Sequence, residues 1–78
     1  MEFVKNPDKL IYSVVEFFPE HDQFIETART FYSWQAEEMA KDIYTRKEKD
    51  ALKNGELIVV KAINRNFNTV LVEYSTVY

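Results

Sequence analysis

Two runs of β-branched residues near the C-terminus constrain the fold of this chain most strongly. Residues 57–60 and 69–72 have the composition of β-strands, because a side chain branched at Cβ packs well on a pleated surface and is disfavoured in a helix. The loop between them, residues 64–68, contains three asparagines, and asparagine tolerates a positive φ better than most residues other than glycine. The pattern predicts an antiparallel β-hairpin.

A helix is predicted directly before this hairpin. Residues 34–54 place Met39 and Ile43 on one apolar stripe, and oppositely charged side chains lie four positions apart on the outer face. Each such pair contributes about 0.3 kcal/mol. Ser33 suits the N-cap position. Gly55, the one glycine of the chain, stands where a left-handed residue commonly ends a helix.

The N-terminal part also has helical spacing. The apolar residues within 10–18 fall on one arc of a helical wheel, and Asn6 and Pro7 suit the N-cap and the first helical position. A strand is the alternative, since most of these apolar residues have high β-propensity. We favour the helix because in a strand Ser13 and Glu16 would fall on opposite faces and place a polar group in each.

Residues 24–32 have the same ambiguity, since they keep helical spacing while 27–32 fit a short strand equally well. We therefore predict one α+β domain over residues 1–78, with two to three helices followed by a C-terminal antiparallel β-hairpin. Residues 2–5 can add an N-terminal edge strand. The alternative is a ββαββ arrangement of sheet on helix.

Charge and composition exclude several classes of protein. The net charge is −3, and an acidic balance argues against a general nucleic-acid binder, which needs clustered Lys and Arg. The chain has no cysteine, which excludes disulfides and thiolate metal sites and favours a cytoplasmic location. No stretch approaches the roughly 18 apolar residues of a membrane span. A soluble cytoplasmic protein without a membrane partner is expected.

The sequence has few of the motifs and residue groupings that are typical of an enzyme. Phosphate-binding loops and nucleophile elbows need several glycines. His21 is the one histidine. Its neighbours Glu20 and Asp22 point in different directions from it, so we expect it in a solvated turn and not in a metal site. Glu37 and Glu38 are expected on a solvated helix face, because neighbouring basic residues neutralise them. We predict no enzymatic activity, no cofactor and no metal.

Aromatic and basic residues outside the expected core suggest a binding surface instead. Arg65, Asn66 and Phe67 lie at the expected hairpin tip, and Trp34 lies away from the Met39 stripe. Aromatic residues and Arg dominate the energetics of protein interfaces, so these four are the predicted contacts with another protein. Phe67 folding back onto a helix is the structural alternative, and homo-oligomer formation stays open. A second candidate is an acidic face formed by Glu16, Glu20, Asp22 and Glu26.

A DNA-binding interpretation rests on the predicted helix. Residues 36–40 can serve as the first helix of a helix-turn-helix and 45–54 as the second, with the hairpin as a wing and Arg65 at its tip. The turn lacks its glycine, and Asp50 occupies a position that should be apolar. One continuous helix is therefore preferred, and a winged helix-turn-helix remains the alternative function.

The chain as a whole is short, glycine-poor, aromatic and acidic, with a helix that begins at Ser33 and a terminal hairpin. In these respects it resembles the small accessory proteins with which tailed phages block host enzymes or defence systems. The resemblance is one of overall style and covers no motif. It implies a stoichiometric inhibitor or adaptor that acts on a host protein, and it assigns no residues.

Overall fold

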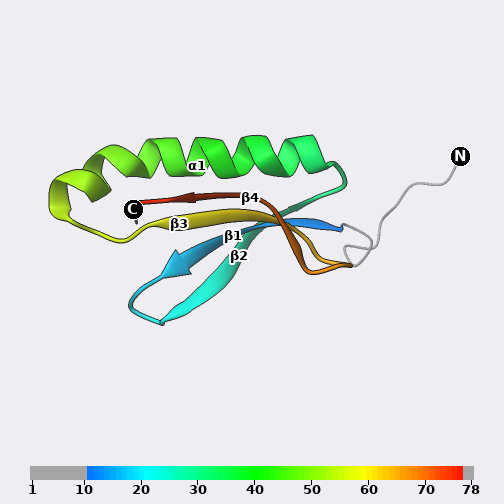
Figure 1. Ribbon diagram of the computed structural model, residues 1–78, viewed down its shortest axis with the longest axis horizontal. Helices are drawn as coiled ribbons and strands as arrows, with labels where there is room; N and C mark the ends of the chain where they lie inside the picture. The colour runs from blue at the N-terminus through cyan, green and yellow to red at the C-terminus, as the bar shows by residue number, and fades with distance from the viewer. Residues whose placement is uncertain (1–10, 77–78) are drawn as a thin grey trace, which may run out of the picture.

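The computed structural model describes residues 11–76, which form four strands and one helix (Figure 1). Strands β1 (Tyr12–Phe18) and β2 (Gln23–Thr30) precede helix α1 (Ser33–Asn54), and strands β3 (Val59–Asn64) and β4 (Thr69–Ser75) follow it. The strands form one sheet in the order β2-β1-β3-β4, and all neighbours are antiparallel. Helix α1 lies across one face of this sheet.

The prediction of two to three helices before a hairpin is wrong, and the ββαββ alternative matches the structure. The C-terminal hairpin itself is confirmed as β3 and β4. Residues 12–18 and 23–30 form strands instead of helices. The N-cap expected at Asn6 and the edge strand expected at 2–5 lie outside the described residues.

The helix predicted over residues 10–18 was wrong because this segment, strand β1, lies in the middle of the sheet. Strand β1 carries apolar side chains on both faces, so it lacks the alternation of a half-buried strand. Ser13 and Glu16 do fall on opposite faces, and each has a polar partner there. The hydroxyl of Ser13 donates to Glu26 at 2.7 Å, and Lys47 donates to Glu16. Both polar groups are therefore satisfied within a strand.

A β-bulge explains the helical spacing of the second element. The pairing of β1 with β2 shifts between Val14, which lies opposite Ala28, and Val15, which lies opposite Glu26. Thr27 is the extra residue, and its hydroxyl donates to the carbonyl of Val14 at 3.2 Å. An extra residue changes which face the following side chains occupy, so the two-residue period is lost.

Helix α1 runs for 22 residues without a break. The described chain therefore contains no helix-turn-helix, because residues 36–40 and 45–54 belong to the same helix. Ser33 is its first helical residue, and the N-cap position falls on Tyr32, which makes no side-chain capping hydrogen bond. The predicted end is confirmed, since Gly55 has a φ of 69° and its N–H donates to the carbonyl of Ala51.

The core forms where α1 meets the middle of the sheet. Small side chains on the helix allow it to approach the strands closely. Next to them, the ring of Tyr44 stacks on Tyr74 with centroids 5.6 Å apart, and its hydroxyl donates to the carbonyl of Ser75 at 3.1 Å. The buried core residues are Val14, Ala36, Ala40, Tyr44, Val60 and Ala62.

Asparagines shape the β3–β4 loop, as the sequence predicts. The side-chain oxygen of Asn64 accepts hydrogen bonds from the backbone N–H groups of Asn66 at 2.9 Å and Phe67 at 3.3 Å. Asn68 has a φ of 52°, a left-handed conformation that asparagine adopts at low cost. These two residues replace the glycines usual in such a turn.

Two valines test where the core lies. Val60 is completely buried, whereas Val70 is 52% exposed. We expect Val60→Ala to lower the free energy of unfolding by about 2 kcal/mol, because two methyl groups are lost and a cavity remains. The matched variant Val70→Ala should change it by less than about 0.5 kcal/mol. Urea unfolding measures both variants. Equal losses in the free energy of unfolding would contradict the placement of the core between α1 and the sheet.

Candidate functional site

Exposed aromatic side chains gather at one end of the molecule. Thr30 at the end of β2 and Asn64 at the end of β3 both lie opposite Tyr12 in β1. The β2–α1 connection and the β3–β4 loop therefore lie at the same end of the sheet (Figure 1). We call four exposed aromatic residues at this end the aromatic end: Phe31 and Tyr32 in the β2–α1 connection, Trp34 in the first turn of α1, and Phe67 in the β3–β4 loop.

Three of these residues form a contiguous group. Tyr32 and Trp34 are each 58% exposed, and their rings stack with centroids 6.0 Å apart and an interplanar angle of 27°. The ring of Phe31 meets that of Tyr32 edge to face at 6.4 Å. Phe67 is 76% exposed at the hairpin tip. Clustered exposed aromatics are unusual on a protein surface and mark contact sites.

The structure separates the predicted contact residues into two groups. Trp34 and Phe67 belong to the aromatic end, and Asn66 lies beside Phe67 in the same loop. Arg65 lies elsewhere, because its Nε is 3.8 Å from a carboxylate oxygen of Glu26 on the face of the sheet opposite α1. The sequence pattern does not single out Phe31 and Tyr32, because both fit the apolar side of an amphipathic element.

The four acidic residues of the second candidate surface do not share one face. Glu16 is 8% exposed and points towards α1, where it pairs with Lys47. Glu26 lies on the opposite face of the sheet. Glu20 and Asp22 lie in the β1–β2 turn, and Asp22 has a φ of 51°.

Glu26 is the centre of a polar cluster on the open face of the sheet. It accepts hydrogen bonds from Ser13 at 2.7 Å and from Arg29. Burial raises the pKa of Glu26, but the hydrogen bonds from Arg29 and Ser13 and the charges of Arg29 and Arg65 outweigh burial, so the pKa lies below its usual value. The cluster therefore favours the ionised carboxylate.

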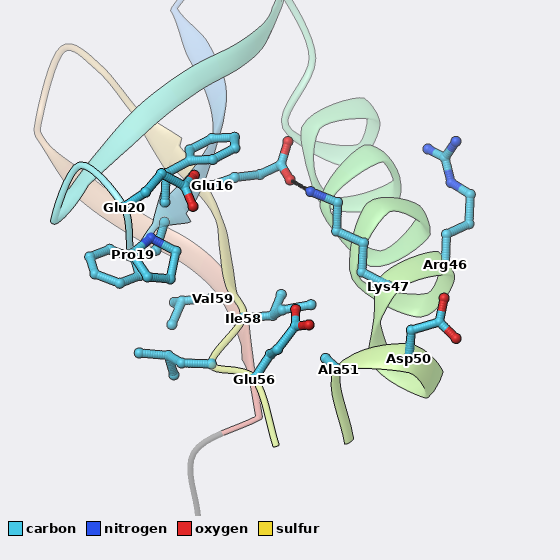
Figure 2. Close-up of a pocket in the computed structure, with 13 residues that line it drawn as sticks. Glu16, Pro19, Glu20, Arg46, Lys47, Asp50, Ala51, Glu56, Ile58 and Val59 are labelled. Carbon is cyan, nitrogen blue, oxygen red and sulfur yellow. Dashed lines mark hydrogen bonds and ion pairs between the residues drawn. The ribbon is translucent and has the colours of Figure 1, made fainter. Parts of the chain in front are cut away.

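A groove lies at the other end of α1 (Figure 2). We call it the helix groove, and its volume is about 700 Å³. The β1–β2 turn with Pro19 and Glu20 borders one side, and the second half of α1 with Lys47 and Ala51 borders the other. Residues 56–59 lie between these two sides, and the ion pair of Glu16 with Lys47 spans the groove.

Comparison with protein-family models, with curated proteins and with solved structures finds no match to this chain. In residues 11–76 no group of three or more His, Cys, Asp or Glu residues could hold a metal ion. The single helix of that region is not long and apolar enough to cross a membrane.

The lowered pKa of Glu26 predicts a pH-dependent contribution to stability. We expect Glu26→Gln to reduce the free energy of unfolding at pH 7 by up to about 1 kcal/mol, since the cluster is partly exposed. This stabilisation is complete above the ordinary glutamate pKa of about 4.3 and is lost as the pH falls through the lower folded value.

Urea unfolding at pH 7 and at about pH 3 measures this contribution, and the wild type and the variant should converge at the lower pH. Glu37→Gln makes the same charge change on the exposed surface of α1 and serves as control. If the difference in free energy of unfolding between the wild type and Glu26→Gln did not change with pH, the role of the ionised carboxylate would be contradicted.

The ion pair in the helix groove predicts a different effect. Lys47→Met keeps most of the aliphatic stem but leaves the carboxylate of Glu16, which is 8% exposed, without its cation. We expect a loss of about 1–3 kcal/mol at pH 7, because a largely buried charge loses its partner. The neighbouring Arg46→Met breaks an exposed pair with Asp42 at 3.0 Å and should cost less than about 0.5 kcal/mol. Denaturant unfolding measures both variants. Equal losses in the free energy of unfolding would contradict a larger contribution from the pair of Lys47 with Glu16.

Proposed function

We propose that this chain is a small protein-binding module without enzymatic activity, and that its contact surface is the aromatic end. The observation that carries the proposal is the stacked pair of Tyr32 and Trp34, each 58% exposed. Trp and Tyr contribute large contact areas with few rotatable bonds, and they are enriched among the residues that dominate binding energy.

The backbone at this pair is held in place before any partner binds. The N–H of Tyr32 donates to the hydroxyl of Thr30 at 3.3 Å, and the N–H of Ala36 donates to the carbonyl of Tyr32 at 3.1 Å. Trp34 lies in the first turn of α1. A preorganised surface loses less conformational entropy on binding, which favours affinity.

The two outer strands favour a different protein over edge-to-edge pairing with a second copy. The pairing of β2 with β1 and that of β4 with β3 each contain a register shift. Such bulges interrupt the regular row of backbone hydrogen bonds that a neighbouring strand would need. The partner we propose is therefore another protein that meets side chains of the aromatic end.

The mode of action we propose is that of a stoichiometric inhibitor or adaptor in the cytoplasm. Its support is the resemblance in overall style to phage accessory proteins that act on host proteins. A module of this kind needs a surface and no catalytic group, which agrees with the proposed role of the aromatic end.

Photo-crosslinking from the aromatic end tests this function. A benzophenone amino acid in place of Trp34 should capture a discrete partner in extracts of cells that naturally express the chain. Tyr32→Ala/Trp34→Ala should weaken binding of the captured protein at least about tenfold. Leu52→Ala, which changes a 48% exposed side chain near the far end of α1, is the control. Equal weakening by both variants, or no discrete crosslink, would refute the proposal.

A further inference from the structure

The helix groove has an apolar interior because α1 and the β1–β2 hairpin diverge at this end. Figure 1 shows the β1–β2 turn lying away from the C-terminal half of α1. A helix of 22 residues is about 33 Å long, and an antiparallel sheet twists along its length. The space that opens is lined by apolar residues from three segments: Phe17, Phe18, Pro19, Ala51, Leu57, Ile58 and Val59.

The size of the groove suits a bound side chain and its neighbours. Its volume of about 700 Å³ falls within the roughly 300–1,000 Å³ of protein ligand sites. Leu57 lines the groove and is still 39% exposed. An apolar group that entered would remove this leucine and the ring of Pro19 from water, which is favourable.

Negative charge without a cationic partner surrounds the opening. The two basic residues that line the groove are already paired, Lys47 with Glu16 and Arg46 with Asp42. Glu20, Asp50 and Glu56 also line it, and within the described part of the chain none of the three forms an ion pair. Figure 2 shows them on different sides of the opening, from the β1–β2 turn, from α1 and from the segment before β3.

From these features we infer that the helix groove binds a basic amphipathic segment of a partner protein. An apolar side chain of that segment enters between Pro19 and Ala51. Lys or Arg residues beside it meet the carboxylates of Glu20, Asp50 and Glu56, which stabilises the complex and raises the association rate. The same carboxylates repel nucleic acid and anionic lipid. The site is at the opposite end of α1 from the aromatic end and does not depend on the function proposed for it.

A titration with defined peptides tests the site. One probe is an amphipathic peptide of leucine and lysine, and the other replaces every lysine with glutamate. Added to the full ¹⁵N-labelled chain, the lysine peptide should shift the amide signals of Ala51, Leu57 and Ile58 and leave those of Tyr32 and Trp34 in place. The glutamate peptide should shift none of them.

Charge variants then test whether the carboxylates at the helix groove bind the lysine peptide. Glu20→Gln/Glu56→Gln should weaken binding of the lysine peptide about fivefold, as expected for the loss of two exposed ion pairs. Glu37→Gln/Glu38→Gln removes the same charge from the first half of α1 and should leave affinity unchanged. Leu57→Lys should abolish binding, because it places a cation on the apolar wall.

Three results would overturn the inference. These are no shift of the groove signals with the lysine peptide, equal shifts with the glutamate peptide, or equal weakening by the two double variants. The amide spectrum of each variant reports folding directly, and the exchanged residues Glu20, Glu37, Glu38 and Glu56 are exposed, so a change in affinity reflects the groove.

Discussion

Small side chains on α1, above all Ala36 and Ala40, allow the helix to lie close against the middle of the sheet, where Val60 and Ala62 are completely buried. The rest of the structure follows from this contact, because one helix is the only layer that covers the sheet in the described residues. The length and direction of α1 decide which sheet residues are buried. On the opposite face, the described residues contact one another within the sheet.

The open face carries polar and cation–π pairs both within and between strands. Ser13 and Arg29 donate to Glu26, and Lys61 lies 3.6 Å from Glu73 and 4.4 Å from the ring centroid of Phe24. Pairs of this kind contribute modestly in water.

The two candidate binding surfaces are consequences of the same packing. At the start of α1 a short connection from β2 leaves Phe31, Tyr32 and Trp34 exposed, with no other element of residues 11–76 over them. At the other end the helix continues while the β1–β2 hairpin turns away, which opens the helix groove. The two surfaces differ in chemistry, since one presents stacked aromatic rings and the other an apolar interior with carboxylates at its opening.

The sequence by itself determined the features that depend on near neighbours along the chain. The β3–β4 hairpin, the turn built on Asn64 and Asn68, and the helix end at Gly55 follow from local backbone preferences and β-propensity. Strand β1 was not predictable in this way, because the polar groups that argued against a strand find their partners far along the chain. Ser13 bonds to Glu26, and Glu16 pairs with Lys47, 31 positions away. Strand β2 was not predictable either, because the bulge at Thr27 breaks its two-residue period. The tertiary structure also decided that Phe67 is exposed while Arg65 approaches Glu26. The helix groove, too, depends on the tertiary structure alone, because three separate segments have to meet before its apolar walls and its carboxylates share one opening.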